Sequence, residues 1–248
     1  MNRFFTNKEN INDSMVTIDG EDVKHIKNVL RLNKGDKIIV CDGHVWEYTV
    51  EIESLEDNQI NGTIIHKEMS NQEPPIDIIL YQSLPKGTKM DLIIQKATEL
   101  GVREIIPVIT QRTVVKLDNQ KKEQKKLERW NRIALEAAKQ SKRGRVPTVS
   151  NILNFKELLN LLKDEDFVIV PYEDECKVGA KEILKKCKTK RINIVIGSEG
   201  GFEEDEVLML KEIGAYIISL GPRILRTETA GFTAISIALY ELGDLGVI

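Results

Sequence analysis

The chain has 248 residues, a formal net charge of −3, 41% hydrophobic residues and 30% charged residues, a composition typical of globular rather than disordered proteins. No apolar run approaches the length that a membrane span requires, and the first residues lack the apolar stretch of a signal peptide. Three widely spaced cysteines, Cys41, Cys176 and Cys187, do not suggest a disulfide framework. These features predict a cytoplasmic protein of one large or two modest domains, without a membrane partner.

Charge is distributed unevenly along the chain. Residues 1–72 contain 8 Lys or Arg and 13 Asp or Glu, residues 86–146 contain 16 and 7, and residues 147–248 contain 12 and 17. A basic section between two acidic ones is expected of a protein that meets phosphate on one face. The alternative is a solvated helix, since KKEQKKLERW at 121–130 also has that composition.

The first part of the chain, to about residue 70, is predicted to be mostly β. Its short β-branched or aromatic runs, separated by turn residues such as Asp-Gly, lie at 35–43, 45–52 and 60–66. One helix, at 19–32, interrupts them. Its apolar face contains Val23, Ile26, Val29 and Leu30. The pattern predicts a small barrel with one helix, and MSNQEPP at 69–75 is the predicted linker.

After the linker, strands and helices alternate. Strands are predicted at 76–82, 103–109, 166–171, 192–197 and 216–221. Helices are predicted at 89–101, 119–142, 155–163, 178–187, 203–214 and from about 228 onward. Continuous apolar strands that alternate with helices predict an α/β fold with a largely parallel sheet, covered on both faces. We therefore expect two domains, at 1–71 and 72–248.

Missing patterns exclude several kinds of site. The three histidines, His25, His44 and His66, have no spacing that pairs them as metal ligands, and no CxxC is present, so no metal is predicted. GxxxxGK[ST] and GxGxxG are absent too, which removes a P-loop and a Rossmann-type site. The lack of GxSxG argues against a serine hydrolase.

The stretch INIVIGSEGGFEEDE, at 192–206, is the first candidate for a ligand site. A buried strand ends there in a glycine-rich loop, and the next helix begins with acids that favour the helix dipole. Glycines let the backbone approach a ligand closely, although many such loops are only tight turns. Because Glu199, Glu203 and Glu204 would repel an anion, a cationic ligand is favoured.

The stretch LGPRILRTETA, at 220–230, is the second candidate, because Arg223 and Arg226 lie in it just before an apolar helix. In a parallel sheet this loop, the glycine-rich loop and PYEDE at 171–175 emerge at the same carboxyl edge, where ligands bind. The acids predicted to share this site with the arginines are Glu173, Glu199 and Glu228. The alternative for the last loop is an internal salt bridge between Arg226 and Glu228.

IGSEGGF at 196–202 followed by LGPRILRTETA closely resembles the signature of the RsmE family of SPOUT methyltransferases. Further segments resemble the same family: NRFF at 2–5, HIKNVLRLNKGD at 25–36, LPKGTKMDLIIQKATELGV at 84–102 and RWNRIALEAAKQSKR at 129–143. The resemblance thus covers nearly the whole chain through several independent motifs. At one position the chain departs from the pattern, because the family usually has Pro where this chain has Ser198, and a looser loop is expected there.

The resemblance implies a PUA-like N-terminal β-barrel, a C-terminal SPOUT α/β domain with a trefoil knot, and a homodimer. It also implies S-adenosylmethionine as the methyl donor and N3 of a uridine in 16S ribosomal RNA of the small subunit as the acceptor. A sulfonium donor suits the acidic lining, and its adenine suits an apolar slot formed by Leu220, Ile224 and Leu225. The predicted cofactor-binding residues are Pro171, Tyr172, Glu173, Ile196, Gly197, Ser198, Glu199, Gly200, Gly201, Leu220, Gly221, Ile224, Leu225, Arg226, Thr227 and Thr229.

The predicted catalytic residues are Arg226, Glu199 and Glu228. Uridine N3 holds a proton at neutral pH and lies on the Watson–Crick edge, so the base must be unpaired or extruded before transfer. Arg226, expected at the boundary of the core, would stabilise negative charge on the uracil carbonyl oxygens. Glu199 or Glu228 could take the proton or could orient Arg226, and the sequence leaves this choice open.

Basic residues in both domains are predicted to contact RNA phosphates, which set affinity and position. They are Arg3, Arg31, Lys86, Arg112, Lys121, Lys122, Arg143 and Arg145. The apolar final helix is expected to pack either on a second subunit or within its own core. Two other functions stay open: a SPOUT enzyme that acts on another RNA such as a tRNA, and a non-catalytic RNA-binding or ribosome-assembly protein. The modified nucleotide, and the choice between naked RNA and an assembled subunit, also stay open.

Overall fold

The computed structural model describes residues 1–115 and 119–247, and the chain divides into two compact units. The first unit comprises Met1–Glu73 and Ala138–Val146, and the second comprises Pro74–Ala137 and Pro147–Ile248. The linker predicted at 69–75 contains the junction between Glu73 and Pro74. The division into functional domains at 1–71 and 72–248 stays a prediction.

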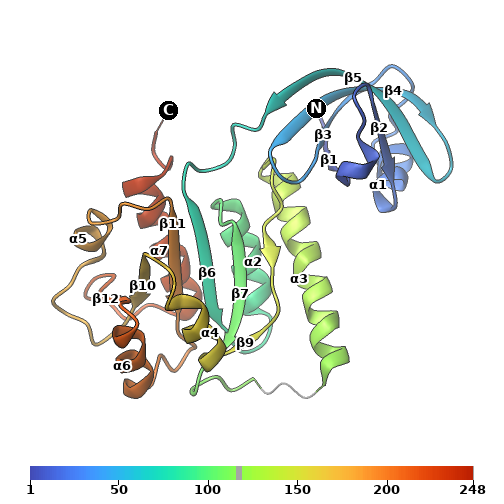
Figure 1. The fold of residues 1–248 in the computed structure, drawn as a ribbon. Coiled ribbons are helices and arrows are strands. Elements are labelled where there is room, and N and C mark those ends of the chain that lie inside the picture. Colours follow the sequence, from blue (N-terminus) through green and yellow to red (C-terminus); the bar gives the residue numbers. More distant parts are fainter. Residues whose placement is uncertain (116–118, 248) are drawn as a thin grey trace. The chain divides into compact units, whose positions relative to one another are not determined.

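The first unit is built on a curled five-stranded sheet in the order β1-β3-β4-β5-β2 (Figure 1). Its strands are β1 (Arg3–Phe5), β2 (Met15–Asp19), β3 (Lys37–Cys41), β4 (Trp46–Leu55) and β5 (Gln59–Met69). β1 pairs parallel to β3, and the other pairs are antiparallel. Alternate side chains of β4, such as Val50 and Ile52, enter one hydrophobic core. The predicted β-rich first part is confirmed.

The helix predicted at 19–32 is present but irregular. A short 3-10 helix, η1 (Lys8–Asn10), precedes β2, and α1 (Glu21–Lys24) continues into a π-helical turn, η2 (His25–Val29). Val23 and Ile26 are buried as predicted, whereas Val29 is 67% exposed. A π turn takes more residues than an α turn, which rotates Val29 off the buried face. The prediction that Val29 shares one apolar face with Val23 and Ile26 was therefore wrong.

Buried ion pairs hold the segment 138–146 within the first unit. Arg143, only 2% exposed, donates to Glu73 Oε2 at 2.6 Å. Arg3 donates to Glu47 Oε2 at 2.8 Å and to the carbonyl oxygen of Arg143 at 3.3 Å. Buried guanidinium groups need such partners, because removing a carboxylate leaves an uncompensated charge. An RNA phosphate could reach either predicted contact only by displacing its carboxylate.

The second unit is built on a parallel sheet in the order β12-β10-β11-β6-β7-β8. Its strands are β6 (Asp77–Ser83), β7 (Glu104–Ile109), β8 (Thr148–Val149), β9 (Leu153–Asn154), β10 (Val168–Pro171), β11 (Arg191–Ile196) and β12 (Tyr216–Ile218). β9 also pairs with β7, and each of these pairs is parallel. The predicted largely parallel sheet is confirmed, and the trefoil knot stays a prediction.

Helices cover both faces of this sheet (Figure 1). The helices after Pro74 are α2 (Lys89–Glu99), α3 (Gln120–Gln140), α4 (Phe155–Leu162), α5 (Ala180–Leu184), α6 (Glu204–Glu212) and α7 (Thr227–Leu242), and the last residues of α3 belong to the first unit. On one face, Leu158 of α4 and Leu210 of α6 join a buried cluster with Ile79 and Val170 of the sheet. α2 and α7 pack against each other on the other face. This arrangement fixes where each strand-to-helix loop emerges.

Candidate active site

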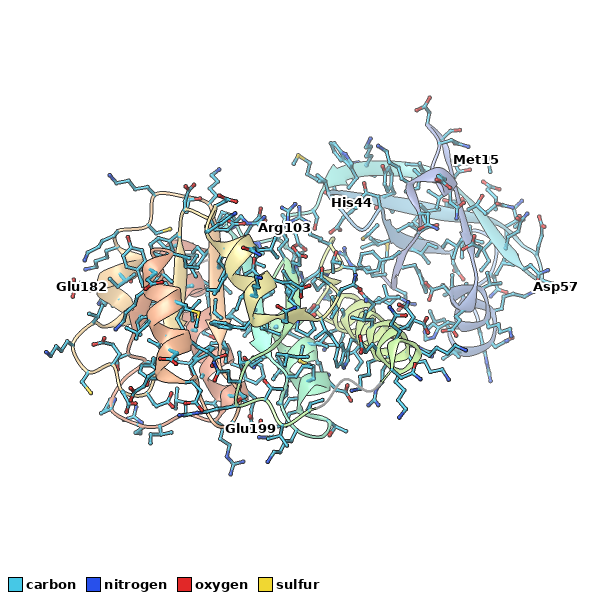
Figure 2. All side chains as sticks on the ribbon, turned by 60° about the horizontal axis from the view of Figure 1, so that its bottom comes forward. Met15, His44, Asp57, Arg103, Glu182 and Glu199 are labelled. Atoms are coloured by element: carbon cyan, nitrogen blue, oxygen red, sulfur yellow. The ribbon has the colours of Figure 1, made fainter. Side chains whose placement is uncertain are left out.

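The loops that follow the parallel strands of the second unit meet at one edge of its sheet. β6 ends at Ser83, β10 at Pro171, β11 at Ile196 and β12 at Ile218, all on the same side. Figure 2 labels Glu199, which follows β11, and Arg103, which precedes β7, at opposite ends of this unit. The predicted meeting of three loops at the carboxyl edge is confirmed.

Two cavities that share part of their walls open between these loops. Their volumes are about 480 Å³ and about 230 Å³. Both are lined by Pro171, Glu173, Ile224, Leu225 and Ala230. The larger is also lined by Tyr172, Glu175, Cys176, Lys177, Gly179, Ser219, Leu220, Gly221, Pro222 and Arg223. The smaller is also lined by Ile196, Gly197, Ser198, Glu199, Gly201, Phe202, Arg226 and Thr227.

The structure brings together nearly all of the predicted cofactor residues. Only Gly200 and Thr229 of that set do not line either cavity. Leu220 and Leu225 are half-buried, whereas Ile224 is 88% exposed. Two of the three side chains of the predicted apolar slot, Leu220 and Leu225, therefore pack against the protein, whereas Ile224 is largely exposed to solvent.

The glycine-rich loop is held in shape by its own hydrogen bonds. Gly201 donates its N–H to Ser198 O at 3.0 Å and has φ +72°, which glycine adopts without strain. A Cβ at Gly201 would overlap the Glu173 carboxylate. The Ser198 hydroxyl accepts from the N–H of Gly200 and donates to Gly201 O, both at 3.4 Å. These contacts offset part of the looseness expected from the absence of Pro at this position.

Arg112, which follows β7, contacts this loop from outside. Its Nε and Nη2 donate to the two Glu203 oxygens at 2.8 and 2.9 Å, and its Nη1 donates to Gly200 O at 2.7 Å. The hydrogen bonds from Arg112 hold the pKa of the Glu203 carboxyl below its usual value. Sequence reasoning assigned Arg112 to RNA, but in this structure its hydrogen bonds fix the glycine-rich loop.

Thr227 joins the glycine-rich loop to the start of α7. Its buried hydroxyl donates to Gly197 O at 2.6 Å and accepts from Gln82 Nε2 at 2.9 Å. Gln82 is fully buried at the end of β6, and its amide also donates to Ser83 O at 3.0 Å. The sequence suggested Thr227 but not Gln82, because a single polar residue at the end of an apolar strand matches no motif that would mark it as part of a site.

Arg226 is the N-cap residue of α7, with φ −65° and ψ 154°, and its side chain is exposed. It lines the smaller cavity, and its guanidinium has no hydrogen bond or ion pair with residues 1–115 or 119–247. The expected location at the core boundary was wrong, since the extended N-cap backbone turns this side chain toward solvent. The alternative salt bridge with Glu228 is not formed either.

Glu199 and Glu228 instead lie beside Lys89, the first residue of α2. Lys89 Nζ is 3.3 Å from Glu199 Oε1 and 3.3 Å from Glu228 Oε2. The backbone N–H of Lys86 donates to Glu199 Oε1 at 3.0 Å. Partial burial raises the pKa of Glu199, but the Lys86 N–H and the Lys89 ammonium outweigh it, so this pKa lies below its usual value. Sequence reasoning missed Lys89, although the residue lies in the LPKGTKM motif.

The other predicted RNA contacts are placed variously. Arg31, Lys86, Lys121 and Lys122 are exposed, and the two last lie in the first turn of α3. Arg145 is half-buried, and its Nε donates to His44 O at 3.3 Å. Their role in RNA binding stays a prediction.

The described part of the chain contains no group of three or more His, Cys, Asp or Glu side chains that could hold a metal ion. Cys41, Cys176 and Cys187 are free, and burial raises the pKa of Cys41 to about 12, which keeps it a thiol. Among residues 1–115 and 119–247, no helix is long and apolar enough to cross a membrane.

Comparison with known families and proteins agrees with this site. A family model described as an RNA methyltransferase domain matches residues 72–239, and one described as an RNA methyltransferase PUA domain matches residues 18–65. The chain is 41% identical to "Ribosomal RNA small subunit methyltransferase E" of Bacillus subtilis, over 97% of each chain.

Two solved structures resemble the whole chain. One, a ribosomal RNA small subunit methyltransferase E from Neisseria gonorrhoeae bound to S-adenosyl methionine, is 32% identical with a TM-score of 0.87, over 98% of this chain and 99% of that one. The other, a methyltransferase from Legionella pneumophila with bound SAM, is 30% identical with a TM-score of 0.86, over 98% of each chain. The matches define the class, an RNA methyltransferase with a PUA domain. The chain belongs to the ribosomal RNA small subunit methyltransferase E family.

The Thr227 hydroxyl generates a first prediction. Thr227→Val keeps the shape of the side chain but removes the hydroxyl donor of the Gly197 carbonyl and one of the two acceptors of the Gln82 amide. The free energy of unfolding, measured by urea denaturation, falls by about 1–3 kcal/mol. Thr229→Val, at an exposed position of the same helix, serves as the control and changes it by less than about 0.5 kcal/mol. Equal losses in the two variants would contradict the assigned hydrogen bonds.

Proposed function

We propose that this protein transfers a methyl group from S-adenosylmethionine to N3 of a uridine in 16S ribosomal RNA of the small subunit. The observation that carries the proposal is the double cavity at the carboxyl edge, with Glu173, Glu199 and Arg226 on its walls. S-adenosylmethionine supplies a methyl group carried by a sulfonium cation. The names of the similar proteins support ribosomal RNA as the substrate, and the two similar structures with bound S-adenosylmethionine support this molecule as the methyl donor.

The residues present fit this donor. Carboxylates near a cavity with apolar walls favour a cation with an apolar body, and they disfavour a free phosphate. Gly197 and Gly201 leave backbone exposed to a ligand, and Gly221, with φ +118°, does so on the opposite wall. Leu220 and Leu225 supply apolar contact for the adenine. The full cofactor-binding set given above, with Gly200 and Thr229 acting through their neighbours, remains our assignment.

Glu228 is the better candidate for the proton acceptor. The Glu199 carboxylate already accepts from the Lys86 N–H, and its lowered pKa makes it a weak base. The Oε2 atom of Glu228 is buried and accepts no hydrogen bond, although Lys89 lies 3.3 Å away. As the N3–carbon bond forms and the carbon–sulfur bond breaks, the N3 proton passes to Glu228. Arg226, with its guanidinium unpaired in the described chain, faces a uracil carbonyl oxygen and stabilises its negative charge.

Exposed basic side chains supply the RNA contacts in this proposal. They are Arg31, Lys86, Lys121 and Lys122, with the half-buried Arg145 in addition. Arg112 holds the glycine-rich loop, and the half-buried Arg3 and the buried Arg143 stabilise the first unit. Contacts of this kind fix affinity and register, while the extruded base is read in the cavity.

We further propose that the chain acts as a homodimer in the cytoplasm, where small ribosomal subunits are assembled. Ile224 is 88% exposed at the cavity mouth, and Tyr240, near the end of α7, is 71% exposed. Large apolar side chains in such positions suit a protein partner better than water. A second subunit over them would close the cavity from outside.

Arg226→Lys tests the mechanism. The variant keeps S-adenosylmethionine binding, measured by calorimetry, but forms 3-methyluridine on small-subunit RNA ~10²-fold more slowly, because an ammonium does not reproduce the fixed guanidinium donors. The control is Arg103→Lys, at the opposite end of the sheet, where Arg103 pairs with Asp77 at 2.7 Å. Assays on naked 16S ribosomal RNA, on small subunits and on tRNA identify the substrate. Methyl transfer by Arg226→Lys at the parent rate would show that the arginine is not catalytic.

Charge reversal on α3 tests the RNA surface. Changing Lys121, Lys122 and Lys125 to Glu weakens RNA binding and lowers the slope of log affinity against log salt by about 2, at ~0.7 for each lost phosphate contact. A matched control changes Lys185, Lys188 and Lys190, all exposed, by the same charge. Filter binding at several salt concentrations measures both. A slope that falls equally in both triple variants would mean that only net charge matters.

A further inference from the structure

Lys89 is bound to two acids that come from different loops. Its ammonium lies 3.3 Å from Glu199, in the loop after β11, and 3.3 Å from Glu228, in the first turn of α7. The exposed fractions of the three side chains fall from 34% for Lys89 to 30% for Glu199 and 13% for Glu228. In the described part of the chain, Lys89 is the one cation paired with either carboxylate.

The Lys89 ammonium reduces the electrostatic repulsion between the carboxylates of Glu199 and Glu228. Two carboxylates close together in a partly dry site repel each other, and one of them tends to take up a proton. A shared ammonium removes that repulsion and lets both stay ionised. The Glu228 side chain needs this most, because its buried Oε2 accepts no hydrogen bond.

The loop between β6 and α2 is shaped to deliver this lysine. Gly87 takes φ +66° just before α2 begins, and Lys86 gives its backbone N–H to Glu199. The loop therefore contacts Glu199 twice, once through backbone and once through the Lys89 side chain. It is thus a fourth loop at this edge of the sheet, held against Glu199, although none of its residues lines either cavity.

We propose that Lys89 is a positioning residue for methyl transfer: its ammonium holds Glu199 and Glu228 ionised side by side, so that Glu228 is ready to accept the N3 proton. This inference rests on the proposed function, which supplies the uridine. Lys89 itself stays protonated throughout and gives up no proton. Before transfer its charge and the donor sulfonium balance the two carboxylates, and afterwards it balances Glu199 alone, since Glu228 is protonated and the sulfur is neutral.

The charged groups near Glu228 are few. Lys89 comes from α2, Glu199 from the loop after β11, and Arg226 lies two residues earlier at the N-cap of α7. The end of β6 contributes only the neutral Gln82 and Ser83. The charged residues of α5, Lys181 and Glu182, are exposed. Removing Lys89 therefore leaves Glu228 without its near cation.

Carboxyl titration by NMR, with ¹³C-labelled glutamate, tests the bridge without any RNA. Compared with the parent protein, Lys89→Met raises the pKa of Glu199 by about one unit or more, because an opposite charge 3.3 Å away is lost. Lys89→Arg keeps this pKa within about half of that shift, since the charge remains. Lys96→Met, on the same helix but paired with Glu99, is the matched control. Unchanged titration in a folded Lys89→Met protein would overturn the proposal.

The pH dependence of methyl transfer is the second readout. The base must be ionised, so the acid limb of the rate profile moves to higher pH in Lys89→Met by the same amount as the titration, and stays in place in Lys89→Arg and Lys96→Met. A rate lowered equally at every pH, with an unmoved limb, would show a merely structural role and overturn the proposal. If the parent protein forms no 3-methyluridine, the proposed function fails, while the titration still decides the role of Lys89.

Discussion

The hydroxyl of Thr227 bonds three elements that meet at the site. It donates to Gly197 O after β11 and accepts from Gln82 at the end of β6, while its own backbone begins α7. These bonds set the separation between the glycine-rich loop and the Arg226 loop, and the smaller cavity opens in that space. Because the group is buried, neither partner can exchange it for water. The two walls of the site therefore move together.

Charge in the site is arranged around this fixed frame. Glu203 pairs with Arg112 outside the glycine-rich loop, Glu173, Glu175 and Glu199 line the cavities, and Glu228 lines neither of them. Lys89 pairs with Glu199 and Glu228, and within residues 1–115 and 119–247 the Arg226 guanidinium has no hydrogen bond or ion pair. In the proposed function, the carboxylates meet the cationic donor, and Arg226 meets the negative charge that develops on the acceptor. The carboxylates of Glu173 and Glu199 on the cavity walls also repel a phosphate, which is why the sequence did not predict a phosphate site here.

The sequence predicted the parallel sheet and the position of its loops, because both follow from the periodicity of apolar residues along the chain. Apolar strands alternating with helices imply a parallel sheet, and a parallel sheet brings the loops at 171–175, 197–201 and 219–228 to one edge. The strands β1, β2, β8 and β9 were not predicted, and β8 and β9 have two residues each, too few to establish a period. Val29 was misplaced for a similar reason, since an α-helical period cannot anticipate a π turn.

Side-chain partners were the part that the sequence did not reveal. Lys89 and Glu228 are far apart along the chain, and nothing in either motif pairs them, so the ion pair appears only in three dimensions. Arg112 and Arg143 were assigned to RNA because they lie in the basic section, and Arg3 because it lies in the PUA-like barrel, but each has a carboxylate partner in the fold. A local pattern reports which residue types are present, whereas burial and pairing decide which charges remain free.

The measurement that tests the account most directly is mass spectrometry of nucleosides from 16S ribosomal RNA in a strain that lacks this protein. The account predicts loss of 3-methyluridine, with recovery when the parent gene is returned and no recovery with a gene that encodes Arg226→Lys. An unchanged content of 3-methyluridine in the deletion strain would contradict it.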